Sequence, residues 1–157
     1  MLPVIRPQFP DMCSDPIFPA ANEVRLLVLD TNIVLDAFVF DESVAQPLKE
    51  ALRGGSVQWL ATPAMRLELA RVLAYPKIVV RLAHCQRSAE QVLAQFDEQS
   101  QMVATAPQAN VTCSDPDDQQ FIDLAVAHQA TLLSKDRAVL CQAKRLAAFH
   151  VQVQTVI

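Results

Sequence analysis

The amino-acid sequence predicts an α/β fold, an α/β/α sandwich around a mainly parallel sheet, on two observations. Short runs of branched apolar residues, the pattern of strands buried on both faces, alternate along the chain with helical stretches. The 157 residues suit one domain, and 52% of them are hydrophobic against 19% that are charged. That apolar share is enough to form a core, which excludes an intrinsically disordered chain.

The N-terminal residues are expected to lie outside this domain. Residues 1–24 contain five of the ten prolines and no helical or strand periodicity, which predicts a weakly ordered tail before a domain of residues 25–157. They lack the continuous apolar core of a signal peptide, and no apolar run in the chain approaches the roughly 20 residues of a membrane-spanning helix. We therefore expect a cytoplasmic protein without membrane association.

The first part of the domain is expected to contain two strands separated by helices. Strands are predicted at 25–30 (RLLVLD) and 56–61 (SVQWLA). Helices are predicted at 32–40 and 43–55, and the second of these ends at a glycine pair suited to a helix C-cap.

A helix with clear boundary residues follows the second strand. Thr62 is a good N-cap, Pro63 suits the first helical position, and Pro76 blocks continuation. Further helices are predicted near 77–82 and 87–100.

The remaining elements alternate in the same way. Residues 101–106 (QMVATA) predict a short strand, and Asp115 followed by Pro116 repeats the helix-start signal. A buried strand, a helix and a half-exposed edge strand are then expected at 130–135, 136–147 and 150–156.

Glycine, cysteine and histidine counts remove several classes of function. The chain has 2 glycines, which are adjacent, so neither a dinucleotide fingerprint nor a P-loop can form. The 4 cysteines are outside metal-clip spacing and the 3 histidines lie far apart, which argues against a structural zinc site. Without a secretory signal, the cysteines are expected to be reduced thiols.

Charge is distributed unevenly although the net charge is only −4, from 13 basic and 17 acidic residues. Between Arg87 and Lys135 there is no Lys or Arg, whereas seven acidic residues fall there. Such a segment either faces water or binds cations. The sequence shows no basic surface of the kind that nucleic-acid-binding domains usually carry.

Two acidic residues follow predicted strands, at the edge where open parallel sheets bind their ligands. Asp30 closes the first strand, and Asp136 follows the strand at 130–135. Taken alone, either residue is explained equally well as an N-cap of the next helix. The prediction of a site therefore depends on further acidic residues.

One further carboxylate lies at the edge of a predicted core-facing stripe. On the helix after Pro63, Glu68 is close in angle to the apolar positions Met65 and Val72. An unpaired carboxylate there is costly, so a structural ion pair with Arg66 or Arg71 is the alternative interpretation.

Another carboxylate faces the core on the helix after Pro116. Asp118 lies one turn before Phe121 and Ile122, which define the inward face of that helix. Asp117 lies on the flank, where a favourable interaction with the helix dipole is an equal explanation. Asp123 points the opposite way and is expected to be solvated.

Four carboxylates, those of Asp30, Glu68, Asp118 and Asp136, are thus predicted to converge. Repulsion among them demands a counter-charge, and the rest of the chain holds 13 acidic against 13 basic residues. Oxygen ligands without His or Cys favour Mg²⁺ or Mn²⁺ over zinc. These metals bind substrate phosphates, so phosphodiester hydrolysis is the natural chemistry.

Four segments of the sequence resemble the PIN domain family. They are DTNIVLDA from Asp30, RLELARVL with Glu68, DPDDQQFIDLA with Asp118 and LLSKDRAVL with Asp136, and the resemblance runs from about residue 25 to residue 157. The chain looks most like the bacterial branch of toxins in toxin–antitoxin systems, similar to VapC-type toxins. Four acids in this order and local context form a fairly specific signal.

The resemblance implies a three-layer α/β/α sandwich that cleaves RNA with Mg²⁺ or Mn²⁺. The four acids carry over as catalytic, metal-binding residues that activate a water for in-line attack on phosphorus. The polar residues expected to support the site are Asn32, Ser134 and Asp117. Lys135 stands where many relatives have glycine, and the cations expected to contact RNA weakly are Lys135, Arg137 and Arg66.

The resemblance also implies partners, namely an antitoxin protein over the acidic pocket and a second copy of the chain in a homo-oligomer. The alternative on the same fold is a protein-binding or regulatory module with little or no catalysis. A phosphoacceptor domain and a haloacid-dehalogenase-type phosphatase fit poorly, because the first strand ends Asp-Thr-Asn, without their second acid.

Overall fold

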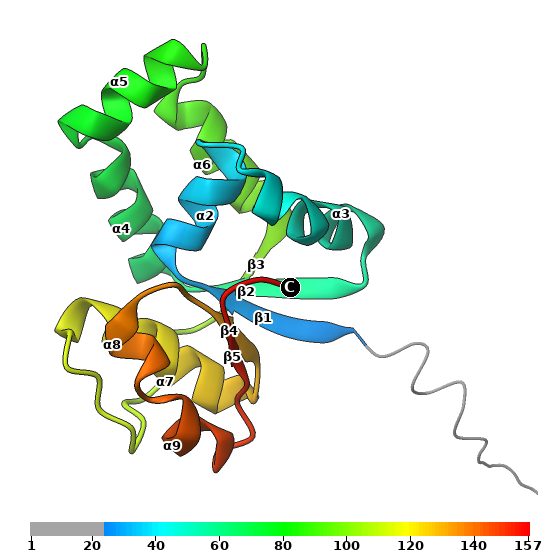
Figure 1. Cartoon of the computed structure of the whole chain (residues 1–157), viewed down its shortest axis with the longest axis vertical. Coiled ribbons are helices and arrows are strands. Elements are labelled where there is room, and N and C mark those ends of the chain that lie inside the picture. Colours follow the sequence, from blue (N-terminus) through cyan, green and yellow to red (C-terminus); the bar gives the residue numbers. More distant parts are fainter. Residues whose placement is uncertain (1–23) are drawn as a thin grey trace, which may run out of the picture.

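A computed structural model describes residues 24–157, which form a sandwich of helices around one sheet (Figure 1). Within these residues five strands pair in the order β3-β2-β1-β4-β5, and every neighbouring pair is parallel. The predicted fold class is therefore confirmed, with a sheet that is wholly parallel in the described part. The predicted tail falls outside the described residues except for Val24.

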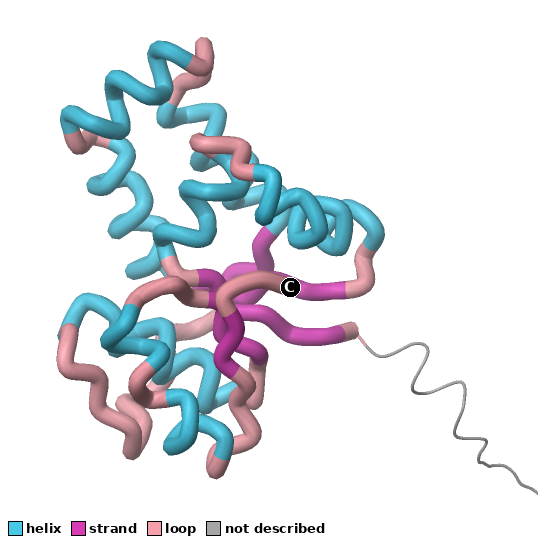
Figure 2. Tube along the Cα trace, viewed as in Figure 1, coloured by secondary structure: helices cyan, strands magenta, loops and turns pink. Residues whose placement is uncertain are grey.

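The strands are short and central (Figure 2). Their bounds are Arg25–Leu29 (β1), Val57–Ala61 (β2), Ser100–Met102 (β3), Thr131–Leu133 (β4) and Val153–Gln154 (β5). All of β4 and the last three residues of both β1 and β2 are buried. The apolar runs in the sequence are thus strands covered on both faces, because helices pack above and below them.

Helices cover both faces of the sheet (Figure 1). One face carries α2 (Thr31–Phe38), the 3₁₀ turn η2 (Ser43–Ala45), α3 (Gln46–Gly54), α4 (Pro63–Leu73), α5 (Pro76–His84) and α6 (Ala89–Gln99). The other carries the 3₁₀ turn η3 (Pro116–Asp118), α7 (Gln119–His128), α8 (Arg137–Leu140) and α9 (Ala143–Ala147). No helix of residues 24–157 is long and apolar enough to cross a membrane.

The predicted helix boundaries have the expected physical causes. The Thr62 side chain accepts a hydrogen bond from the Met65 backbone N–H, with Pro63 at the first helical position of α4. Gly55 ends α3 in a left-handed conformation with a φ of 77°, which glycine adopts without a steric penalty.

Two expectations about the elements are wrong. Residues 136–147 form two short helices, α8 and α9, which are separated by a turn at Cys141 and Gln142. The strand predicted at 101–106 pairs only as far as Met102, after which residues 103–115 leave the sheet.

The order of the strands creates a crevice at one edge of the sheet. The chain moves outward from β1 to β2 and β3, and then returns to the other side of β1 to form β4. In open parallel sheets such a reversal opens a crevice beyond the carboxyl ends of the strands. Leu29 and Leu133 are register partners, so the residues that follow them, Asp30 and Ser134, leave the sheet side by side.

Candidate functional site

Three acidic residues meet beyond the ends of β1 and β4. Asp30 follows β1, Asp118 ends η3, and Asp136 precedes α8; each offers one carboxylate oxygen, and these oxygens lie within 4.8 Å of one another. We call these three residues the acidic cluster. Such a set of oxygen atoms can hold a metal ion.

Ser134 fixes two members of the acidic cluster. Its hydroxyl donates a hydrogen bond to Oδ2 of Asp30 at 2.7 Å and accepts one from the backbone N–H of Asp136 at 3.0 Å. The serine is completely buried, so water does not compete for these bonds. This arrangement couples the end of β1 to the start of α8.

The helix-capping interpretation holds for one of the two strand-end acids. Asp136 accepts a hydrogen bond from the Ala138 backbone N–H through Oδ1, at 2.9 Å. Asp30 precedes α2 but its side chain makes no capping hydrogen bond. Asp30 therefore needs another explanation for its burial, and the bond from Ser134 supplies only part of it.

Asp118 shows most clearly that the cluster lacks a positive charge. The residue is only 7% exposed, and its buried Oδ2 has no hydrogen-bond partner in the described part of the chain. Burial raises its pKa to about 8, and the neighbouring carboxylates of Asp136 and Asp30 add to the shift. Burial also raises the pKa of Asp30. No Lys or Arg of residues 24–157 forms an ion pair with the cluster, so its residues fit a divalent cation.

Glu68 lies in the same pocket but outside the tight cluster. Its carboxylate accepts hydrogen bonds from Thr31 Oγ1 at 2.5 Å and from Gln120 Nε2 at 3.0 Å. Burial raises its pKa, and the charges of Asp30 and Asp117 contribute. Within residues 24–157 Glu68 forms an ion pair with neither Arg66 nor Arg71, the two partners considered from the sequence, and Arg66 pairs with Asp97 instead.

A pocket of about 670 Å³ opens over the acidic side chains. Its acidic side is lined by Asp30, Asn32, Glu68, Asp115, Asp117 and Asp118. Its other side is mainly apolar and is lined by Leu35, Val72, Tyr75, Pro76 and Ile78, together with Arg71 and Lys77. Asn32 and Asp117 line this pocket and are exposed. The supporting roles expected for them from the sequence stay predictions.

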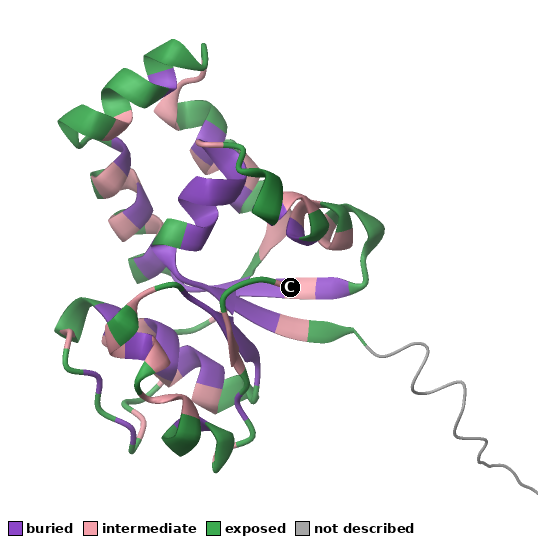
Figure 3. Cartoon of the chain, in the orientation of Figure 1, coloured by how far each residue is buried: buried purple, intermediate pink, exposed green. Residues whose placement is uncertain are grey.

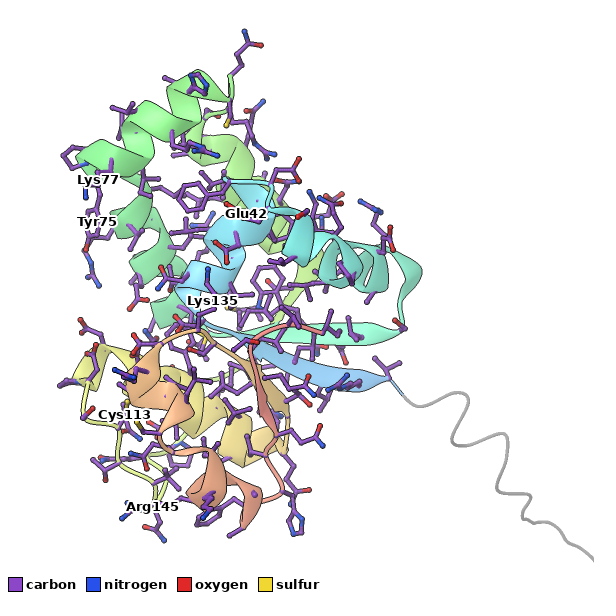
Figure 4. The ribbon with its side chains drawn as sticks, viewed as in Figure 1. Glu42, Tyr75, Lys77, Cys113, Lys135 and Arg145 are labelled. Carbon is purple, nitrogen blue, oxygen red and sulfur yellow. The ribbon has the colours of Figure 1, made fainter. Side chains whose placement is uncertain are left out.

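Two of the three cations expected to contact RNA are engaged elsewhere. Arg66 donates two hydrogen bonds to the Asp97 carboxylate, at 2.7 and 2.9 Å. The Lys135 ammonium lies 2.5 Å from Asp36 on α2, and Figure 4 places Lys135 between the two helical layers. Arg137, the first residue of α8, is exposed.

The Lys135–Asp36 pair gives an asymmetric stability prediction. The Asp36 side chain is 9% exposed and the Lys135 side chain 50%, so removing the lysine leaves a buried carboxylate without a counter-charge. We expect Lys135→Met to lower the free energy of unfolding by about 1–3 kcal/mol, and Asp36→Asn to lower it by less. Urea unfolding of both variants measures the difference. A larger loss in Asp36→Asn would contradict this account of the pair.

Several polar residues near the site were not predicted from the sequence. Thr31 and Gln120 hold Glu68 in place through hydrogen bonds. Thr31 follows Asp30 directly, which is a sequence signal for its place near the site, whereas the sequence gives no such signal for Gln120. The expectation that Asp123 is solvated is wrong: it accepts hydrogen bonds from the Ala109 backbone N–H at 2.9 Å and from Gln119 at 2.8 Å. Residues 103–115 pass over the side of α7 that carries Asp123. The helical period of α7 gives no information about which segment packs on that side.

Comparison with known proteins agrees with this geometry. The sequence matches the PIN domain family over residues 26–138, a range that contains every acidic residue discussed above. A search of curated proteins gives no match. Among solved structures, the chain resembles the crystal structure of VapBC2 from Rickettsia felis bound to a promoter DNA fragment. The TM-score is 0.56 and the sequence identity is 13%, and the match covers 82% of this chain and 98% of the other chain. At this identity the likeness concerns the fold. The family match spans most of the chain, which therefore belongs to the PIN domain family.

Proposed function

We propose that the protein is an endoribonuclease that hydrolyses RNA phosphodiesters with Mg²⁺ or Mn²⁺, and that it is the toxin of a toxin–antitoxin pair. One observation carries the nuclease proposal. Three carboxylates meet at the strand reversal, and within residues 24–157 one of their buried oxygens has no hydrogen-bond partner and no basic side chain pairs with them. A divalent cation supplies the missing charge.

The proposed roles follow from the contacts of each side chain. Asp30, Asp118 and Asp136 would hold the ion, and Glu68 stands beside them to orient water or a further ion. When bound, the ion acidifies a coordinated water and neutralises charge on the scissile phosphate. Ser134 keeps Asp30 and Asp136 in place, and Thr31 and Gln120 do the same for Glu68.

The toxin proposal is supported by family membership and by the structural likeness to VapBC2. It implies an antitoxin protein that covers the pocket, and a homo-oligomer for which the exposed apolar side chains of α5 offer surface. Val79 and Val80 are 49% and 69% exposed. We place the protein in the cytoplasm, in keeping with the free thiols of Cys85, Cys113 and Cys141.

The decisive experiment is cleavage of mixed-sequence RNA by the full chain. We expect cleavage with Mg²⁺ or Mn²⁺, none in EDTA, and none by Asp30→Asn, because that variant loses a ligand charge while Ser134 can still donate to its amide oxygen. Gel analysis of a labelled RNA measures the products. Equal cleavage by the wild type and Asp30→Asn would show that the activity does not come from this site.

The alternative proposal is a protein-binding or regulatory module that keeps the fold with little catalysis. It is favoured by the position of Lys135, whose ion pair with Asp36 takes away one of the few cations next to the cluster. In that case the wild type would bind a protein partner and leave RNA intact with either metal.

A further inference from the structure

We propose that the corner between α4 and α5 is a subsite for one nucleotide of single-stranded RNA, in which Tyr75 stacks on the base and Arg71 and Lys77 contact the flanking phosphates. The inference rests on the proposed function, since it states where RNA lies relative to the acidic cluster. We call these three residues the corner subsite. All three line the same pocket as Asp30 and Asp118 of the cluster.

Electrostatics explains why cations are needed there. Phosphate must approach a group of carboxylates in a chain of net charge −4, so the pocket needs local positive charge. Six of the twelve basic side chains of residues 24–157 already have partners: Arg25 with Thr131, Lys49 with Asp41, Arg66 with Asp97, Arg81 over the Phe40 ring, Arg87 with Gln95, and Lys135 with Asp36.

Only two of the remaining described cations line the acidic pocket. The others, Arg53, Arg137, Lys144 and Arg145, do not line it, whereas Arg71 and Lys77 do. Arg71 lies close enough to Glu68 to act against the rise of its pKa. Lys77 is the second residue of α5 and lines the same pocket. The two cations therefore supply positive charge to the lining of the acidic pocket.

Tyr75 lies between these cations in the sequence and is held away from the core. Its backbone is extended, with a ψ of 142°, because α4 ends at Leu73 and Pro76 opens α5. The side chain is half exposed, and Tyr75 is the one large exposed aromatic residue of the described chain. Figure 4 shows Tyr75 and Lys77 beside each other at this corner, and Figure 3 shows that the adjoining α5 is almost wholly exposed.

The alternation of ring and charge fits single-stranded RNA better than a protein segment. Bases present apolar faces that stack on aromatic rings, and a phosphate lies on either side of each nucleotide. Val72, Pro76 and Ile78 give the base an apolar surround. A basic peptide drawn to the acidic cluster would be repelled by Arg71 and Lys77, and an acidic peptide has no flat base between its charges to stack on Tyr75.

Binding of RNA under conditions that prevent cleavage tests the subsite. The probe is a short, mixed-sequence, fluorescein-labelled single-stranded RNA, and its anisotropy is titrated in EDTA with the full chain at several salt concentrations. We expect Tyr75→Leu to weaken binding about 5- to 100-fold and Tyr75→Phe to stay within about twofold, because the ring performs the stacking. Arg71→Gln should reduce the slope of log K against log salt by about 0.7.

Arg53→Gln is the matched control, since it removes an exposed cation from α3, away from the pocket, and should leave the slope unchanged. Circular dichroism melts confirm that each variant is folded, as expected for exposed positions. Wild-type affinity in Tyr75→Leu, or equal slopes for Arg71→Gln and Arg53→Gln, would overturn the subsite. Absence of RNA binding by the wild type would also overturn it and favour a protein occupant. Binding that depends on Tyr75 without cleavage in Mg²⁺ or Mn²⁺ supports the subsite and counts against the nuclease proposal alone.

Discussion

Replacing Asp118 with Asn is expected to lower RNA cleavage by more than about 100-fold and yet to stabilise the metal-free protein. Removing a residue that only orients a metal ligand lowers metal affinity or activity 10–100-fold. Asp118 is proposed to be a ligand itself, so its loss is expected to have a larger effect. The gain in stability has a separate cause. The Asp118 carboxylate is 7% exposed beside two other carboxylates, which raises its pKa to about 8, and a neutral amide avoids that repulsion.

Two measurements check this prediction together. Isothermal titration with Mn²⁺ should show loss of binding, and urea unfolding in EDTA near pH 8 should show a gain on the order of 1–3 kcal/mol. Asp97→Asn is the matched control, because Asp97 is an exposed carboxylate on α6 paired with Arg66. It should leave Mn²⁺ affinity within about twofold. If Asp118→Asn bound Mn²⁺ as tightly as the wild type, the acidic cluster would not be the metal centre.

Metal affinity is expected to rise steeply with pH up to about 8 and to level off above it. Below that pH the metal-free protein holds a proton on Asp118, since burial raises its pKa to about 8, and the ion must displace that proton to bind. The affinity should therefore fall about tenfold for each pH unit below 8. Asp30 shifts in the same direction and steepens the dependence at lower pH.

The raised pKa of Asp118 also determines how the stability of the metal-free protein depends on pH. The trend is opposite to that of the metal affinity. Because the folded protein binds this proton more tightly than the unfolded chain, the contribution of Asp118 is fully present below its ordinary pKa of 3.8 and is lost as pH rises through about 8. Thermal melts in EDTA should show a falling midpoint over this range, and saturating Mn²⁺ should remove most of the fall. A flat profile in EDTA would mean that Asp118 is not shifted.

Local sequence signals were sufficient for the fold and for part of the site. Apolar runs of branched residues gave β1, β2 and β4, and capping residues such as Thr62 gave the helix starts, because both depend on neighbours within one or two turns. The acids at strand ends were identifiable because parallel strands end at one edge of the sheet. Register then places Asp30 beside Ser134.

By itself, the sequence determined a parallel α/β domain with acidic residues at the carboxyl edge of its sheet. Only the tertiary structure decided the partners of the charged side chains: Lys135 with Asp36, Arg66 with Asp97, and Asp123 with the backbone of Ala109. It also separated Glu68 from the three acids that come within 4.8 Å of one another. The reason is physical, since a helical period fixes the angle of a side chain about its own axis but not the element packed against it.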